Sequence, residues 1–370
     1  MKEWINKLTK EERLTIVGVF LTIFGSYFGY SGLDKKIRVP ISAIISLIGG
    51  IILLIQDIGY YKQGLYTEKQ KKILATLAML GLIVVCREDS LYLSLVIAAN
   101  FIHKDLKQLM KIIFYSSVIS FVLICLLCLV GLIPNATNTR GMFGTEITKM
   151  AIGFSHPNVT TRFFFGILLI GLFVCKDRVL YGLISLLLGT IAFFITWSRA
   201  GIIATIAFFI ICLIPRKITN KVFKLNYIPY LFIIFTLISV VCALFMHDGR
   251  INELSSGRFG LWYGYIKEIG VFAKIERIGG PLDNMFVNTM YYGGMYGYIY
   301  YFVIYLLAFS KIKKNNDTIF IIALTTFICG FFENFSGYGE SKFLLISLIL
   351  ILNENKIEEL QEKHIQKVCQ

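Results

Sequence analysis

Apolar residues gather along this chain in long runs, and polar and charged residues fall in the short segments between them. A helix that crosses a bilayer needs roughly 20 mostly apolar residues. The pattern predicts an all-α polytopic membrane helix bundle with about 12 transmembrane helices. The runs cover about 14–30, 39–55, 73–86, 90–102, 112–133, 158–175, 179–197, 200–214, 228–246, 285–309, 318–335 and 341–352.

Several of these runs are shorter than a full bilayer crossing. The third and fourth, separated by Arg87, Glu88 and Asp89, fit either two tilted spans or one re-entrant pair. All the runs lie within residues 1–352, which we expect to form a single membrane domain, and residues 353–370 are expected to form a short cytoplasmic tail.

Positive charges between the runs predict the orientation. With twelve spans and a cytoplasmic N-terminus, 23 of the 37 Lys and Arg residues fall in cytoplasmic segments and 13 in outer segments. Cytoplasmic loops of membrane proteins carry an excess of Lys and Arg. The sequence therefore predicts that both termini are cytoplasmic, although Lys35, Lys36 and Arg38 form an outer cluster against this trend.

Composition agrees with a membrane protein. The 370 residues are 56% hydrophobic and 16% charged, with a mean hydropathy of +0.70, which excludes a soluble globular enzyme, a disordered chain and a secreted disulfide scaffold. The formal charge of +14 is spread over inter-helix segments, which argues against a nucleic-acid partner. No metal-ligand cluster and no nucleotide-binding motif is present, so we expect no metal and no cofactor.

Two long loops are expected on the outer side, at about 134–157 and 247–284. The second has apolar residues at helical spacing, which predicts an amphipathic helix lying along the membrane surface with its aromatic face toward the lipid. Ser255 or Ser256 is the expected cap of that helix. The spaced residues are Leu261, Trp262, Tyr265, Ile266, Ile269, Phe272 and Ala273.

Three arginines near the outer side are candidates for anion binding. Arg199 stands in a short break between two apolar runs, Arg258 falls in the first turn of the predicted amphipathic helix, and Arg162 lies inside a run near its outer end. Charged residues in or beside spans are costly and mark functional sites. A guanidinium suits phosphate because its planar fork donates two hydrogen bonds at once. The alternatives are a headgroup anchor for Arg199, a solvated loop residue for Arg258 and a snorkelling side chain for Arg162.

Acidic and polar residues at the same predicted side could complete a site. Asp283 stands just before a span, where a carboxylate serves either as a general base or as a helix cap. Glu253 is a second possible base. The remaining substrate-contact candidates are His156, Asn158, Asn284 and Glu333.

Four short motifs in order resemble the O-antigen polymerase and O-antigen ligase superfamily over about residues 75–350. They are Gly153-Phe-Ser-His-Pro-Asn158, Trp197-Ser-Arg-Ala-Gly201, Ser256-Gly-Arg258 followed by Trp262, and Asp283-Asn284 followed by Gly293. The high Lys, Ile and Asn content is typical of an AT-rich genome and favours a capsular or exopolysaccharide polymerase of the Wzy type from a Gram-positive bacterium.

The resemblance implies a glycosyltransferase at the outer face of the bacterial cytoplasmic membrane. Such enzymes move a glycan from an undecaprenyl-diphosphate carrier to an acceptor hydroxyl without nucleotide or metal, and a polymerase uses another lipid-linked unit as acceptor. By motif match, Arg199 and Arg258 would hold the diphosphate, with Arg162 as a candidate outside the motifs. Membrane lipid, a flippase and a chain-length regulator are the implied partners. In ligases a histidine before Asn is the proposed base, and Asp283 takes that position here.

Two other functions remain open from the sequence. One is a ligase-like transferase that delivers a finished glycan to a different acceptor. The other is a flippase for the lipid-linked oligosaccharide, which would be expected to show internal repeats and broken helices near the bilayer midplane.

Overall fold

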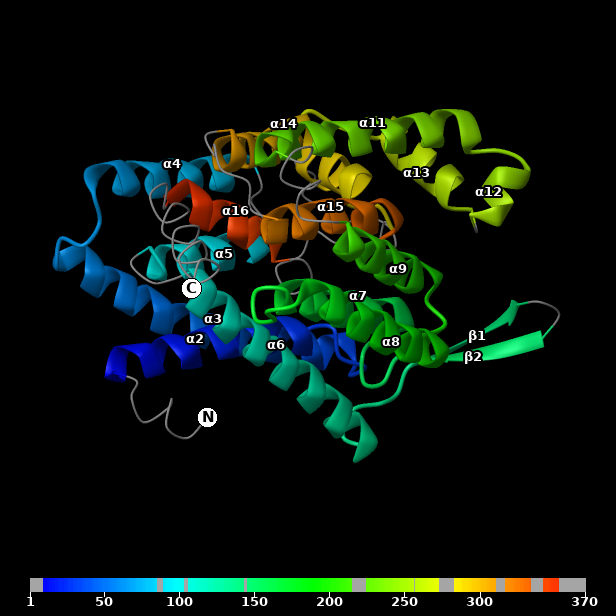
Figure 1. Ribbon diagram of the computed structural model, residues 1–370, viewed down its shortest axis with the longest axis horizontal. Helices are drawn as coiled ribbons and strands as arrows, with labels where there is room; N and C mark the ends of the chain where they lie inside the picture. The colour runs from blue at the N-terminus through cyan, green and yellow to red at the C-terminus, as the bar shows by residue number, and fades with distance from the viewer. Residues whose placement is uncertain are drawn as a thin grey trace.

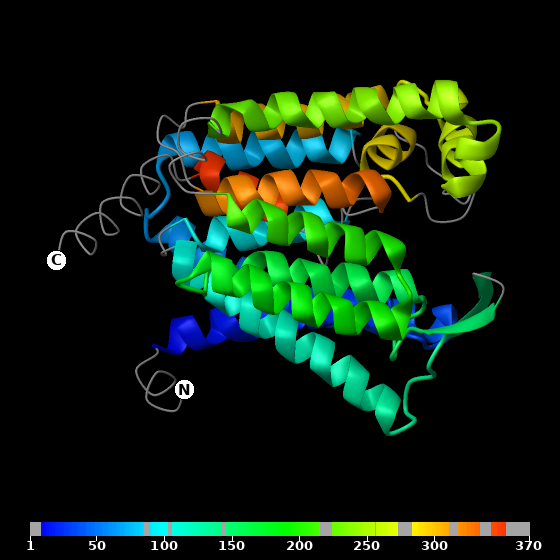
Figure 2. The same cartoon turned by 45° about the vertical axis from the view of Figure 1, so that its right-hand side comes forward.

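A computed structural model of the chain shows an elongated bundle in which most helices run side by side (Figures 1 and 2). It describes residues 9–84, 89–102, 106–142, 145–214, 224–255, 257–272, 283–310, 317–333 and 342–352. Each predicted apolar run coincides with a helix. These helices are α2 Lys10–Phe28, α3 Lys35–Lys62, α4 Glu68–Val84, α5 Asp89–Asn100, α6 Leu106–Leu129, α7 Pro157–Gly171, α8 Arg178–Thr196, α9 Arg199–Leu213, α11 Ile228–Met246, α14 Met285–Phe309, α15 Asp317–Phe332 and α16 Phe343–Leu352.

Within the described residues, four helical segments are long and apolar enough to cross a membrane: Lys35–Lys62, Leu106–Leu129, Arg178–Thr196 and Leu225–Met246, the last joining the short helix η1 (Leu225–Tyr227) to α11. Shorter apolar helices, among them α9, α15 and α16, accompany them. The helical membrane class is therefore supported, whereas a total of twelve spans stays a prediction. The tail at 353–370 lies outside the described residues, as do residues 85–88 between α4 and α5.

Polar side chains mark where several helices begin. The Asp34 carboxylate accepts from a backbone N–H at the start of α3, and Asp177 and Asn284 do the same at α8 and α14. Ser198 caps α9 through its hydroxyl. These side chains satisfy backbone donors that have no partner within the helix, so each one fixes where an apolar segment starts.

The outer loop at 134–157 contains an element that the all-α prediction lacked. Strands β1 (Thr137–Met142) and β2 (Thr145–Met150) form an antiparallel hairpin. Its base is tied to the turn between α2 and α3, because the Gly32 N–H donates to the Gly153 carbonyl and the Ser155 N–H donates to the Tyr30 carbonyl. The hairpin thus has a fixed position at one end of the bundle (Figure 1).

The predicted amphipathic helix in the second loop is corrected by the structure. The segment forms two helices, α12 (Arg250–Leu254) and α13 (Arg258–Lys267), and Gly257 with a φ of 79° precedes α13 in place of a serine cap. Ser255 instead ends α12, and Ser256 lies outside the described residues. Trp262 is 1% exposed and packs against Phe331. One aromatic face of α13 therefore packs on the protein and not on lipid.

Helix α14 is broken inside its length. Gly294 has a φ of 64° and a ψ of −175°, which lies outside the helical region. The backbone N–H groups of Met295 and Tyr296 donate instead to the carbonyls of Gly270 and Val271. Residues 270–271 of the long outer loop therefore lie alongside α14 and supply acceptors that the broken helix lacks.

Candidate functional site

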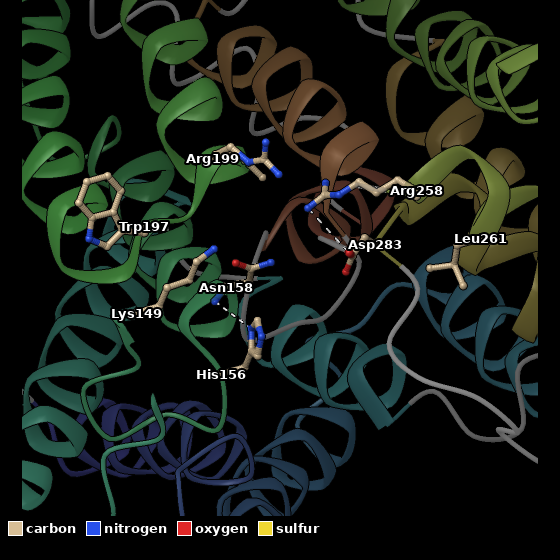
Figure 3. A pocket seen from close by; sticks show the side chains of 10 residues that line it. Lys149, His156, Asn158, Trp197, Arg199, Arg258, Leu261 and Asp283 are labelled. Carbon is tan, nitrogen blue, oxygen red and sulfur yellow. Dashed lines mark hydrogen bonds and ion pairs between the residues drawn. The ribbon is translucent and has the colours of Figure 1, made fainter. Parts of the chain in front are cut away.

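The hairpin and α12 lie at the same end of the bundle (Figures 1 and 2). A cavity of about 240 Å³ is lined by residues of the hairpin and of several helix ends. Segments far apart in the sequence line it: β2, the start of α7, the α8–α9 turn, the start of α13 and the residue before the α14 cap. All these segments fall on the side predicted to be extracytoplasmic. The lining residues are Lys149, His156, Asn158, Trp197, Arg199, Ala200, Gly257, Arg258, Leu261 and Asp283 (Figure 3).

Arg199 reaches the cavity because of a sharp turn between two apolar helices. Helix α8 ends at Trp197, which adopts a left-handed conformation with a φ of 49°. The Ser198 hydroxyl then accepts from the Gly201 N–H and starts α9, with Arg199 as its first residue. Figure 3 shows the Arg199 side chain directed into the cavity, opposite Asn158 and Arg258.

Arg258 crosses from α13 to the end of α15. One of its terminal nitrogens donates to the Phe332 carbonyl, and the other lies 3.2 Å from Glu333 Oε1 and 3.7 Å from Asp283 Oδ2. The side chain therefore joins the start of α13, the end of α15 and the segment before α14. Arg258 is therefore not a solvated loop residue, because two carboxylates and a backbone carbonyl lie around its guanidinium.

Glu333 lies behind the cavity lining and outside helix α15, which ends one residue earlier at Phe332. It is 3% exposed, and its Oε1 also accepts from Asn158 Nδ2 at 3.0 Å. Burial raises the pKa of this carboxyl, and the negative charge of Asp283 raises it further, while Arg162 and Arg258 oppose the shift. The structure places the predicted contact residue Glu333 as a partner of Asn158 and Arg258.

His156 caps α7 as well as lining the cavity. Its Nδ1 accepts from the Asn158 backbone N–H at 3.1 Å, so the neutral ring carries its proton on Nε2. Burial lowers the pKa of His156. The negative charge of Asp283 raises this pKa, and the positive charges of Arg162 and Lys149 lower it further. The imidazole at neutral pH is therefore a hydrogen-bond donor through Nε2, and its accepting nitrogen is occupied.

The adjacent residues Asp283 and Asn284 have separate environments. Asn284 is fully buried and its side-chain oxygen accepts from the N–H groups of Phe286 and Val287, while its amide nitrogen donates to Ser239 and to the Phe331 carbonyl. The helix cap is therefore Asn284 and not Asp283. Asn284 does not line the cavity. Among the described residues that line it, Asp283 is the acidic one.

The sequence also predicts Arg162 and Glu253 as members of the site, and neither is among the residues that line the cavity. Arg162 is 9% exposed on α7, and it stands behind the lining, near enough to His156 and Glu333 to change the pKa of both. Glu253 is exposed on α12 and is not among the lining residues. The structure thus brings Arg162 to the site and leaves Glu253 outside it.

Lys149 is a lining residue that sequence reasoning missed. It follows Ile147 and Thr148 in β2, and β-branched residues of this kind are typical of a strand. The hairpin pairing of Lys149 with Asn138 and the ties at its base bring this lysine to the cavity. The β-branched residues favour a strand, and they do not indicate where a hairpin packs.

The charges around the cavity are unequal. Lys149, Arg162, Arg199 and Arg258 carry positive charge, and Asp283 and Glu333 carry negative charge when ionised, which leaves an excess of two positive charges among these described groups. Within the described part of the chain, no group of three or more His, Cys, Asp and Glu residues could hold a metal ion. The arrangement suits an anionic ligand with about two negative charges, such as a diphosphate diester.

Comparison of this chain with family models, with curated proteins and with solved structures finds no significant match.

Proposed function

We propose that this protein is a membrane glycosyltransferase that polymerises oligosaccharide repeat units carried on undecaprenyl diphosphate. One observation carries the proposal. Lys149, Arg199 and Arg258 converge from three separate elements on one cavity, beside the carboxylate of Asp283, at the side of the bundle predicted to be outer. The cavity of about 240 Å³ is smaller than the roughly 300–1,000 Å³ of sites that enclose a drug-sized ligand. It is sized for the diphosphate, with the glycan and the lipid extending outside it.

The proposed reaction is a single displacement at the anomeric carbon of the donor. The acceptor hydroxyl oxygen forms a bond to the anomeric carbon of the donor, and the bond from that carbon to the diphosphate oxygen breaks. The leaving diphosphate gains negative charge, which Arg199, Arg258 and Lys149 stabilise more in the transition state than in the ground state. The hydroxyl proton passes to the Asp283 carboxylate. A single displacement of this kind inverts the anomeric configuration.

Asp283 is the better candidate for the base than the two other groups near it. His156 uses its Nδ1 as a helix cap, and Glu333 is buried behind the lining. Asp283 is partly exposed and lines the cavity beside Arg258. We further propose the bacterial cytoplasmic membrane as the location, and a flippase and a chain-length regulator as partners.

The decisive experiment is polymerisation by the purified protein in lipid vesicles with a defined undecaprenyl-diphosphate repeat unit. No nucleotide or metal is added, and products are separated by length. A ladder of products is the expected result. Binding of the substrate without any product would overturn the polymerase proposal and direct attention to a ligase that lacks its acceptor, or to a flippase, which a transbilayer movement assay would then detect.

A further inference from the structure

Glu333 connects the two sides of the cavity through a single oxygen atom. Its Oε1 accepts from Asn158 Nδ2 at 3.0 Å and lies 3.2 Å from Arg258 Nη2. Asn158 belongs to the first turn of α7, and Arg258 begins α13. Both side chains line the cavity, whereas Glu333 is covered by them. Two lining residues from distant segments therefore take their orientation from one buried carboxylate.

This carboxylate is costly for the fold. Glu333 is 3% exposed, and burial disfavours its ionised form. The charged groups that face it are Asp283 beside the start of α14, which repels it, and Arg162 of α7 and Arg258 of α13, which attract it. Its pKa in the folded protein is raised, so ionisation of this carboxyl reduces the stability of the fold. The penalty is complete above the raised pKa, shrinks as the pH falls below it and vanishes below the ordinary glutamate pKa.

A glutamine at this position could still accept from Asn158, but its neutral oxygen would hold the Arg258 guanidinium more weakly than a carboxylate does. The ionised carboxylate also lowers the positive charge around the cavity and so weakens the attraction for an anion. Stability and anion affinity both favour a neutral residue here. A carboxylate must therefore have another advantage at this position. Its contacts indicate that this advantage is a fixed orientation of the Arg258 guanidinium.

We propose that Glu333 is a positioning residue that weakens binding of the donor diphosphate and in return orients Arg258, with Asn158, for transfer. The proposal rests on the proposed function, because it takes the cavity as the diphosphate site. Glu333 does not touch the substrate in this account. It acts by holding the Arg258 fork in one geometry before the leaving group develops its charge, which is the preorganisation that transition-state stabilisation requires.

The test compares Glu333→Gln with the unaltered protein in lipid vesicles by two measurements. Binding of inorganic diphosphate is measured by calorimetry, and polymerisation of the lipid-linked repeat unit is measured by single-turnover rate. Removing one nearby negative charge should tighten diphosphate binding about threefold to tenfold at mildly alkaline pH. The loss of a fixed guanidinium should slow transfer by about tenfold to a hundredfold. A merely structural role would weaken both properties together.

The pH dependence gives a second readout. As the pH falls, Glu333 in the unaltered protein becomes protonated, so its diphosphate affinity and its transfer rate should approach those of Glu333→Gln. The two proteins should therefore differ at alkaline pH and converge at acidic pH. Glu333→Asp keeps the charge but shortens the side chain, and it should transfer slowly while binding diphosphate with nearly the original affinity. Glu146→Gln, an exposed change on β2, is the matched control.

The outcomes separate this inference from the proposed function. Equal binding and equal rates in Glu333→Gln, or a loss of both, would overturn the positioning role. If the unaltered protein binds diphosphate but transfers nothing, the polymerase proposal fails, and the pH-dependent difference in binding still decides whether Glu333 controls the anion site. If the unaltered protein binds no diphosphate, both proposals are wrong.

Discussion

Arg199 and Arg258 supply charge to the same cavity by different local structures. Arg199 is the first residue of α9 and follows a left-handed turn at Trp197. Arg258 contacts Phe332 and Glu333 through different nitrogens of one guanidinium. A lysine has a single ammonium group and cannot reproduce a planar fork. The two positions therefore need arginine geometry and not just a positive charge.

Lysine substitutions test this point. Arg199→Lys and Arg258→Lys should each lower the polymerisation rate roughly tenfold to a hundredfold, which corresponds to about 1.5–3 kcal/mol for one charge-assisted hydrogen bond. Membrane insertion, measured by extraction of the membrane fraction, should stay normal. Full activity in either lysine variant would show that fork geometry at that position is unimportant.

Asp283 and Asn284 allow a paired test of chemistry against capping. Asp283→Asn should abolish polymerisation without weakening donor binding, and it should leave the melting temperature nearly unchanged, because Asp283 makes no cap hydrogen bond. Asn284→Ala should lower stability by about 1–2 kcal/mol or more, since it removes the cap of α14 and leaves the buried Ser239 and Phe331 groups without their partner. Near-normal polymer from Asp283→Asn would exclude Asp283 as the base.

At the scale of elements, the break in α14 makes one glycine indispensable. Gly294 has a φ of 64°, and a Cβ placed there would come within 2.5 Å of the Phe272 backbone. The neighbouring Gly293 has no such constraint, since its nearest atom would be the Tyr298 nitrogen at 3.9 Å. The two glycines therefore differ in what a methyl group would cost.

Gly294→Ala should lower the free energy of unfolding by about 2 kcal/mol or more, through an unfavourable φ and a backbone clash. Gly293→Ala should be nearly neutral or slightly stabilising, because the methyl group meets ordinary contact distances. Thermal unfolding in detergent, followed by circular dichroism, measures both. A small effect at Gly294 would mean that the outer loop does not pack against α14 at the break.

The elements of the outer loops show where sequence patterns stop being informative. Helical spacing correctly placed a helix around Trp262, but it extended that helix past Lys267 and turned its aromatic face toward lipid. Spacing identifies an apolar face and not the surface that the face covers. Here the covering surface is the protein, and residues 270–271 instead supply acceptors to the broken helix α14.

At the scale of the whole molecule, orientation in the membrane is open to a direct measurement. Single cysteines are introduced as Glu146→Cys in the hairpin and Lys69→Cys in α4, in a chain whose native cysteines are replaced. A membrane-impermeant maleimide should label Glu146→Cys in intact cells and should label Lys69→Cys only after permeabilisation, because the Lys and Arg excess favours cytoplasmic termini. The reverse pattern would place the cavity on the cytoplasmic side.

The sequence by itself determined the class of fold and most of its elements. Apolar runs of this length satisfy their backbone groups internally only as helices, so their positions follow from composition and periodicity. It also identified Arg199, Arg258 and Asp283, because charged residues at the ends of apolar runs are costly and therefore conspicuous. The sequence did not show which of the adjacent residues Asp283 and Asn284 caps the helix and which one faces the cavity.

The tertiary structure decided which of these residues meet and what each one contacts. Only the packing of distant segments brings Lys149 from a hairpin to the cavity, leaves Glu253 outside it and buries Glu333 between Asn158 and Arg258. These outcomes depend on long-range contacts between helix ends, which leave no periodic trace in the sequence. Local pattern sets where a helix begins and ends, and the charge balance of the cavity arises only when the helix ends are assembled.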